Sequence, residues 1–291
     1  MPIKGHNGPL LHSTLFCLSL CQPMPAYASL RQPPPACSSQ RSLHQPALLA
    51  LLRVPPHNPP FMFIAAIETS GTRGGVALAD DDELIGAESF EAGMVHGRSL
   101  VPALDRILKK AGIAPRDLGL VAVDVGPGSY TGVRVGVAAA RMIAMAIGCP
   151  VAPIVSLDVL AENAEDLEDF VCPILDARWE QVYGASFRRD WVWLRTDGPA
   201  AYKPEELAAR LASGTTVFGS GVDKYPAVFA SLPKGPAEWG VPKAEVVARL
   251  GWQAFQAGAT DECNILRPLY LRPTEAEVKF GVAETPPPPA C

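Results

Sequence analysis

The sequence predicts an α/β protein, and three adjoining features within residues 120–147 carry that prediction. Residues 120–125 (LVAVDV) form a short β-branched run of the kind that is buried in a parallel sheet. A glycine-rich segment follows at residues 126–136 (GPGSYTGVRVG), and a helix with almost no large polar side chains is expected at residues 131–147. Proteins of the α/β class place ligands where a strand ends in such a turn and a helix begins.

The glycine-rich turn contains residues that allow unusual backbone conformations. Gly126 and Gly128 can adopt a positive φ or let another backbone segment approach closely, and Ser129 or Thr131 can cap the helix. Exposed amides at such a helix start favour an anion. The segment is not a Walker A loop, because Val133 and Arg134 stand where a Lys-Ser/Thr pair would be required. A purely structural turn and a turn beside a phosphate group are both compatible with these residues.

The expected helix at residues 131–147 is apolar around nearly all of its circumference, and Arg134 and Arg141 are its charged residues. Such a helix must be covered on two sides. One cover is the chain's own sheet, and the other is either a second layer of the same domain or a partner molecule. Small residues recur at every fourth position, namely Gly132, Gly136, Ala140 and Ala144.

A second, amphipathic helix is expected at residues 99–111. Leu100, Leu104 and Leu108 follow helical spacing, and Gly112 is typical of a helix end. If the two helices pack side by side, they form one shared apolar face.

Five segments occur in a characteristic order along the chain: 64–70 (IAAIETS), 96–100 (HGRSL), 126–134 (GPGSYTGVR), 174–178 (ILDAR) and 268–272 (PLYLR). Together they closely resemble the TsaB (YeaZ) family, the dimerisation subunits of the bacterial machinery that makes threonylcarbamoyladenosine in tRNA. The resemblance runs from residue 62 to residue 275. Two departures concern ligand contacts: Glu68 stands where the family has Asp, and Gly97-Arg98 replaces Ser-Glu.

The resemblance implies a two-lobed, actin-like and sugar-kinase-like (ASKHA) fold with mixed sheets flanked by helices. The N-terminal lobe would span residues 62–163 and carry the partner-binding helices, and the C-terminal lobe would span residues 164–275. The sequence is compatible with this division. Strands are expected at residues 63–69, 75–79, 83–90 and 120–125, then at 171–175, 181–187, 192–196 and 215–218, with further helices at 204–211 and 244–257.

The two ends of the chain have compositions that cannot bury a core. Residues 1–61 contain 12 prolines, four basic residues and no acidic residue, and residues 276–291 are also rich in proline. We expect both segments to be disordered. Residues 1–61 are a start-site overcall with Met62 as the alternative start, a genuine extension, or a targeting leader.

The net charge and the numbers of cysteines and histidines restrict the kinds of ligand that this chain is expected to bind. Without residues 1–61 the chain has 21 basic and 30 acidic residues, and this acidic body should repel a tRNA backbone. The seven cysteines do not form a disulfide framework, and their spacing predicts no zinc site. His96 is the one histidine beyond residue 61, so paired histidines cannot hold a metal there. No span of about 20 apolar residues predicts a membrane helix.

The resemblance implies a cytoplasmic, non-catalytic subunit that dimerises with a TsaD-like transferring subunit. It further implies a TsaE-like ATPase in the same complex, a homodimer when TsaD is absent, and only indirect contact with tRNA. We expect the partner interface to use the two helices, through His96, Leu100, Leu104, Leu108, Gly132, Val133, Arg134, Gly136, Val137, Ala140, Arg141 and Ala144.

The alternative is an enzyme, either an autonomous ATP-dependent kinase of the ASKHA type or a glycoprotease-like hydrolase. A nucleotide would contact Thr69, Ser70, Gly126, Gly128 and Ser129. We expect no required cofactor and no catalytic or metal-binding residue in this chain, although ATP or ADP could lie at or near the partner interface. The hydrolase reading lacks support, because the sequence has no His-Glu-x-x-His motif.

Overall fold

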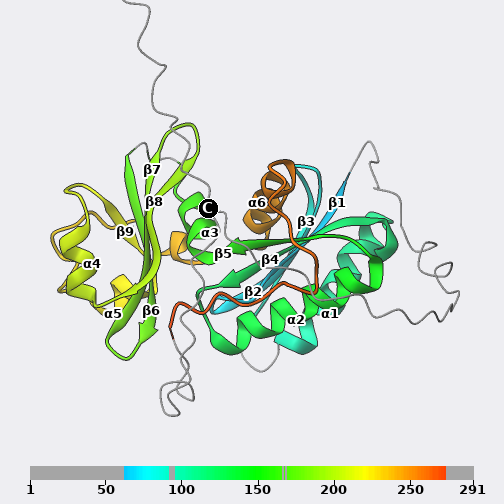
Figure 1. Ribbon diagram of the computed structural model, residues 1–291, viewed down its shortest axis with the longest axis horizontal. Coiled ribbons are helices and arrows are strands. Elements are labelled where there is room, and N and C mark those ends of the chain that lie inside the picture. Colours follow the sequence, from blue (N-terminus) through cyan, green and yellow to red (C-terminus); the bar gives the residue numbers. More distant parts are fainter. Residues whose placement is uncertain (1–61, 92–95, 166, 168, 273–291) are drawn as a thin grey trace, which may run out of the picture. The chain divides into compact units, whose positions relative to one another are not determined.

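The computed structural model describes residues 62–91, 96–165, 167 and 169–272 (Figure 1). The predicted disordered segments, residues 1–61 and 276–291, lie outside these residues, as does the side chain of His96.

The first sheet has five strands in the spatial order β3-β2-β1-β4-β5. β1 is parallel to β4, and β4 is parallel to β5, whereas the β1–β2 and β2–β3 pairs are antiparallel. The strands are β1 (Phe63–Glu68), β2 (Arg73–Asp80), β3 (Glu83–Glu91), β4 (Leu118–Gly126) and β5 (Val151–Val155).

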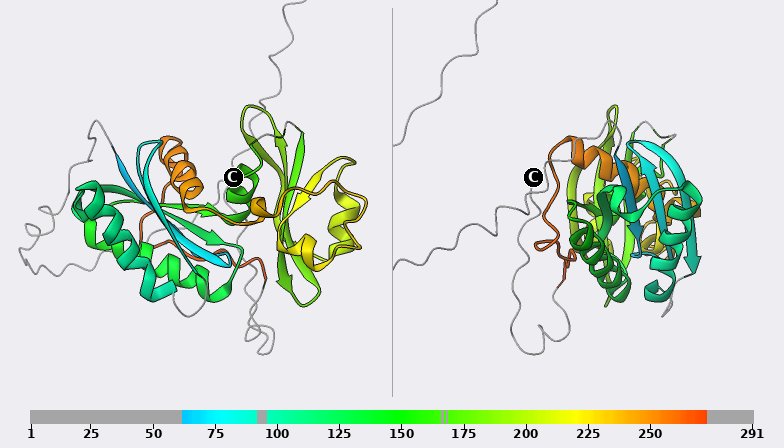
Figure 2. Two further views of the ribbon diagram at one scale, coloured as in Figure 1. Left: turned by 180° about the vertical axis from the view of Figure 1, so that it is seen from behind. Right: turned by 90° about the vertical axis from the view of Figure 1, so that its right-hand side faces the viewer.

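Helices cover both faces of this sheet, and the period-two alternation of strand residues decides which helix each side chain meets. Ala65 and Ile67 of β1 pack in one cluster with α1 (His96–Ala111) and α2 (Tyr130–Ile147). Their neighbours Ile64 and Ala66 point the other way and pack with α6 (Ala244–Gln256). Figures 1 and 2 show α1 and α2 side by side on one face and α6 on the other.

The second sheet has four strands in the order β8-β7-β6-β9. One face packs against α3 (Ser156–Glu162), and the other packs against α4 (Pro204–Arg210) and α5 (Ser220–Lys224). Two short 3₁₀ turns, η2 (Pro115–Asp117) and η3 (Ala237–Gly240), lie in connections. The strands are β6 (Phe170–Arg178), β7 (Gln181–Arg189), β8 (Trp193–Tyr202) and β9 (Thr216–Phe218).

After α6 the chain continues as an irregular segment, residues 261–272, which we call the C-terminal strap. The backbone of Asp261 exchanges two hydrogen bonds with Val151 of β5, and the amide of Leu269 donates to Val125 of β4. The strap ends at Arg272, whose guanidinium donates to backbone carbonyls at the end of β6.

Most predicted strands and helices are present, but three short elements were missed. β5, α3 and α5 have five, seven and five residues, too few for a periodic pattern to identify them. The boundary at residues 163 and 164 stays a prediction. One part of the predicted C-terminal lobe needs correction, because α6 packs on the first sheet and not on the second.

The small-residue ridge of α2 packs on the chain's own sheet. A Cβ added to Gly132 would overlap the carbonyl oxygen of Thr69, and one added to Gly136 would overlap the Thr69 hydroxyl. Ala140 and Ala144 are fully buried in the same cluster. α2 is long and apolar enough to cross a membrane by length and composition alone, but this ridge fixes it against the sheet.

We predict that Gly136→Ala lowers the free energy of unfolding by about 1–3 kcal/mol, because the added methyl group overpacks the contact with Thr69. Alanine's higher helix propensity, about 1 kcal/mol, would otherwise favour the variant. Urea denaturation measures the difference. Gly97→Ala is the matched control, since its Cβ would lie 4.0 Å from Val135 Cγ1, and it should not be destabilised. Equal midpoints for the two variants would contradict the packing argument.

Candidate functional site

Two buried carboxylates, Glu68 and Asp124, lie at the carboxyl ends of the parallel strands β1 and β4. Their exposed fractions are 1% and 0%. Glu68 Oε1 accepts the amides of Ser70 at 2.6 Å and of Gly71 at 3.1 Å. Asp124 Oδ1 accepts the Ser156 hydroxyl at 2.5 Å. We call Glu68 and Asp124 the carboxyl pair.

The hydroxyl of Ser70 joins the carboxyl pair. Its oxygen lies 2.7 Å from Glu68 Oε1 and 2.9 Å from Asp124 Oδ2. A serine hydroxyl has one hydrogen and can donate it to only one of these oxygens. The other contact is a hydrogen bond only if the carboxyl group is the donor. The geometry therefore favours a proton on one carboxyl group of the pair.

Burial gives the same conclusion from electrostatics. Removal from water, together with the Asp124 charge, raises the pKa of Glu68 from 4.5 to about 8. Burial also raises the pKa of Asp124, to about 6, against the opposing effect of hydrogen bonds from Ser156, Gly126 and Ser70. The pair holds a proton near neutral pH.

The glycine-rich turn closes directly over β1. Gly126 has a φ of 104°, as its predicted conformational freedom allows. A Cβ on Gly128 would overlap the Ser70 backbone. The Ser129 amide donates to the Ser70 carbonyl at 2.8 Å, and its hydroxyl caps α2 by accepting the Gly132 amide at 3.3 Å. The turn therefore has at least the structural role among the two roles that the sequence allowed.

This packing corrects part of the predicted nucleotide site. The side chains of Thr69 and Ser70 are buried, and the Thr69 hydroxyl donates to the Gly132 carbonyl at 2.8 Å. Gly126 is buried, whereas Gly128 and Ser129 are exposed. A phosphate therefore cannot reach Thr69 or Ser70 unless the turn moves. Within the described residues no group of three His, Cys, Asp or Glu side chains is placed to hold a metal ion.

The predicted partner interface also needs correction. The structure places most of its side chains inside the chain's own core, so they cannot contact a partner directly. The buried residues are Leu100, Leu104, Leu108, Gly132, Val133, Gly136, Val137, Ala140 and Ala144. The pattern of small residues alone could not show whether α2 packs on the chain's own sheet or on a partner, because both kinds of contact favour small residues. His96 is the first residue of α1, and its side chain lies outside the described part of the chain.

A different set of residues forms the exposed side of the same two helices. Met142 and Met145 are 67% and 71% exposed, and Val101 of α1 is 55% exposed. We call this surface the outer helix face. It comprises Val101, Tyr130, Arg134, Ala138, Met142 and Met145. The sequence signal was present, because the α2 members of this set occupy the side of the helix opposite the glycines.

The two predicted interface arginines remain at the surface. Arg134 stacks over the Tyr130 ring at 5.2 Å and donates to its hydroxyl at 3.0 Å, and Tyr130 in turn lies 5.4 Å from the Tyr270 ring. Arg141 donates to the Asn264 carbonyl in the C-terminal strap at 3.4 Å. Both arginines are thus held beside the outer helix face.

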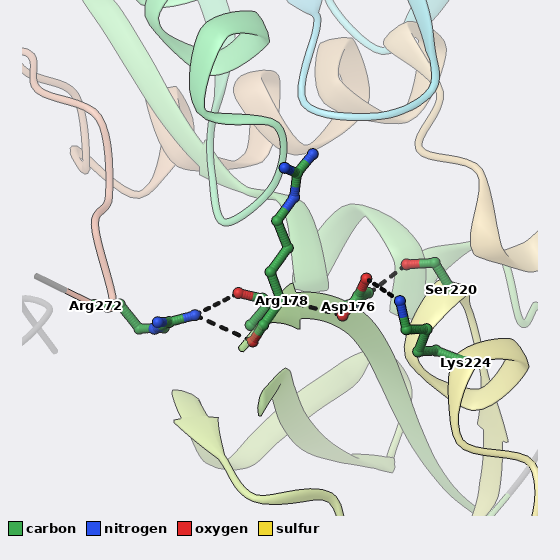
Figure 3. A network of polar contacts seen from close by, with 6 residues as sticks. Asp176, Arg178, Ser220, Lys224 and Arg272 are labelled. Carbon is green, nitrogen blue, oxygen red and sulfur yellow. Dashed lines mark hydrogen bonds and ion pairs between the residues drawn. The ribbon is translucent and has the colours of Figure 1, made fainter. Parts of the chain in front are cut away.

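A second polar network joins two of the segments that carried the family resemblance, 174–178 and 268–272 (Figure 3). The turn after β6 contains three consecutive non-glycine residues with positive φ, starting at Arg178. Arg272 donates to the carbonyls of Ala177 and Arg178. Asp176 accepts the Arg178 amide at 2.9 Å and lies 3.7 Å from Lys224 Nζ. These contacts hold a turn that would otherwise be strained, and Figure 3 shows the Arg178 side chain extending away from them.

The order of the first sheet, the helices on both of its faces and the turn after β4 define an α/β protein with a mixed sheet between two layers of helices. Residues 90–209 match the family described as "TsaD: tRNA N6-adenosine threonylcarbamoyltransferase". The structure is similar to YeaZ from Pseudomonas aeruginosa, with a TM-score of 0.64 and 25% identity, over 72% of this chain and 100% of that one.

Comparison with sequence relatives leads to the same family as comparison with structures. An Escherichia coli "tRNA threonylcarbamoyladenosine biosynthesis protein TsaB" is 29% identical over 72% of this chain and 95% of its own length. An uncharacterised Mycobacterium tuberculosis protein is 30% identical over 74% of this chain and 93% of its own length. The Bacillus subtilis TsaB is 38% identical over 42% of this chain, and the match spans about half, 53%, of that relative. The chain belongs to the TsaB (YeaZ) family.

The protonated carboxyl pair predicts a pH-dependent stability. Folding raises the pKa of Glu68 from 4.5 to about 8. The Glu68 carboxyl group therefore contributes fully to the free energy of unfolding below pH 4.5, and this contribution is lost as the pH rises to about 8. The slope is at most about 1.4 kcal/mol per pH unit for one proton. The glutamine side chain of Glu68→Gln is neutral at every pH. Between pH 5 and pH 8.5 the free energy of unfolding should therefore fall less for this variant than for the wild type.

Denaturant titrations across this pH range test the slope. Glu91→Gln removes an exposed carboxyl group from β3 of the same sheet and should keep the wild-type slope. Parallel curves for the wild type and Glu68→Gln would show that Glu68 does not hold the proton.

Proposed function

We propose that this protein is a non-catalytic subunit in the biosynthesis of threonylcarbamoyladenosine in tRNA, and that its outer helix face binds a TsaD-like transferring subunit. The names of its TsaB relatives support the pathway. The observation that carries the proposed partner is the outer helix face itself.

The chemistry of that face favours a protein partner. Methionine side chains are flexible and polarizable, and they are frequent on surfaces that bind other proteins. Met142 and Met145 lie on one side of a helix whose opposite side is fixed to the sheet. Arg134, held by Tyr130, provides a charged rim next to them. Burial of this apolar surface contributes about 25 cal/mol per Å² before association costs are deducted.

The likeness to TsaD explains why a TsaD-like subunit would fit. The matching region, residues 90–209, includes both α1 and α2. A partner of related fold would carry a similar helix pair in the same place. Two similar faces can pair about an approximate twofold axis, as two identical faces do in a homodimer. We therefore retain the homodimer as the pairing expected when the partner is absent, and a TsaE-like ATPase as a further member of the complex.

The carboxyl pair supports a non-catalytic role over the kinase alternative. A phosphotransferase needs an ionised base at the acceptor, acids that hold metal and cationic charge at the moving phosphate. Glu68 and Asp124 are instead buried and hydrogen-bonded to Ser70, and burial raises the pKa of both carboxyl groups. We place any bound ATP or ADP near the partner interface, where Gly128 and Ser129 are exposed, and we assign tRNA contact mainly to the partner.

We predict that the double variant Met142→Glu, Met145→Glu weakens binding to the TsaD-like subunit of the same organism by at least about tenfold, equivalent to about 1.4 kcal/mol. Two carboxylates would have to be buried against the partner. Calorimetric titration measures the affinity, and the melting temperature should stay unchanged because both side chains are exposed.

Trp191→Glu is the matched control, because Trp191 is 93% exposed but lies on the β7–β8 hairpin of the second sheet. It should bind like the wild type. The same three proteins should then be compared for tRNA threonylcarbamoyladenosine in cells that lack the native gene. Undiminished binding by the double variant would exclude the outer helix face, and full modification without the chain would exclude the proposed function.

A further inference from the structure

Two cysteines that the sequence treated as separate thiols are brought to the same place by the fold. Cys149 lies between the end of α2 and the start of β5, and Cys263 lies near the start of the C-terminal strap. They are 114 positions apart in the sequence. Both are partly buried, and both pack against the core cluster beneath α1 and α2.

The backbone pairing brings together the two segments that carry the cysteines. Val151 and Asp261 form an antiparallel bridge, in which the Val151 amide donates to Asp261 at 3.0 Å and the Asp261 amide donates to Val151 at 2.8 Å. In antiparallel pairing, a step back along one strand matches a step forward along the other. Cys149 stands two residues before Val151, and Cys263 stands two residues after Asp261. In a continued ladder these two positions would be opposed with Cβ atoms about 4.5–5.5 Å apart, and a disulfide needs about 3.5–4.5 Å, so closure requires a small movement of the strap.

Electrostatics gives an independent sign that the thiols are close. Burial raises the pKa of the Cys149 thiol to about 11, and the nearby Cys263 charge adds to this effect. Cys172 differs, because it is fully buried in the second sheet and packs in another cluster.

We propose that Cys149 and Cys263 are a redox-sensitive pair that forms an intramolecular disulfide when the protein meets a low-molecular-weight disulfide such as oxidised glutathione. The thiolate of Cys263 attacks the small disulfide, forms a mixed disulfide and releases one small thiol. The thiolate of Cys149 then attacks the Cys263 sulfur and releases the second. The two protein thiols lose two electrons and two protons, and the small disulfide gains them as two thiols.

The order of attack follows from the surroundings of Cys149. Its raised pKa leaves little thiolate at neutral pH, so it reacts slowly with a molecule in solution. Once Cys263 carries the mixed disulfide, the second step is intramolecular and benefits from a high effective concentration. Cys263 is therefore the attacking residue, and Cys149 is the resolving residue.

The disulfide would fix the start of the C-terminal strap to the segment that leaves α2. The same strap receives the Arg141 contact, pairs with β4 through Leu269, and ends at Arg272 on the turn after β6. Oxidation would therefore restrain the segment that links the outer helix face to the Arg178 turn.

The test exposes the reduced full-length chain to oxidised glutathione, followed by alkylation, digestion and mass spectrometry without reduction. We expect one peptide pair joined through Cys149 and Cys263, with a mass lower by two hydrogens than the separate peptides. The melting temperature should rise and return to its reduced value with dithiothreitol. Amide exchange in residues 261–272 should slow in the oxidised form.

Three variants separate the steps. Cys149→Ser should accumulate a glutathione mixed disulfide on Cys263, whereas Cys263→Ser should leave Cys149 mostly unmodified over the same time. Cys291→Ser, which removes a thiol outside the described residues, should still form the link. The proposal is overturned if both thiols remain fully alkylated at excess oxidant, or if the cysteines join only between chains.

Discussion

The contact between the glycines of α2 and the end of β1 determines most of this structure. Gly132 and Gly136 let the helix backbone lie directly against Thr69, at a distance that no larger side chain would allow. That contact places the start of α2 over β1 and β4 and holds the glycine-rich turn against Ser70. It also decides which side of α2 faces outward. The closed turn and the outer helix face are therefore two results of one packing contact.

At the carboxyl end of β1, contacts within the chain occupy a position where related folds bind a ligand. In the α/β class, the carboxyl ends of parallel strands commonly receive a ligand. Here Ser70 receives the Ser129 amide on its backbone, and its side chain joins Glu68 to Asp124. Glu68 Oε1 also accepts the amides of Ser70 and Gly71, as Asp124 Oδ1 accepts the amide of Gly126. Both carboxyl groups are therefore held by the backbone of the turns that follow them.

The sequence predicted the α/β class and both long helices, because each has a local signal in glycine placement or apolar periodicity, and of its two cap candidates, Ser129 and Thr131, the structure uses Ser129. It did not predict that α6 returns to the first sheet, since tertiary pairing over such a separation leaves no local pattern. Most of the predicted interface residues proved to be buried for a related reason. A ridge of small residues shows only that something comes close, and Thr69 proved to be that neighbour. The closeness of Cys149 and Cys263 likewise depends on the Val151–Asp261 pairing.

The position of α6 has a consequence for how the chain is made. Ile64, Ala66 and Ala77 form half of a core whose other half, around Val247, is encoded about 170 residues later. A ribosome completes the entire second sheet before α6 emerges, so one apolar face of the first sheet stays uncovered during that interval. Such surfaces are sites of misassembly in growing chains. The newly made first sheet therefore presents an apolar face on which the growing chain can misassemble until α6 covers it.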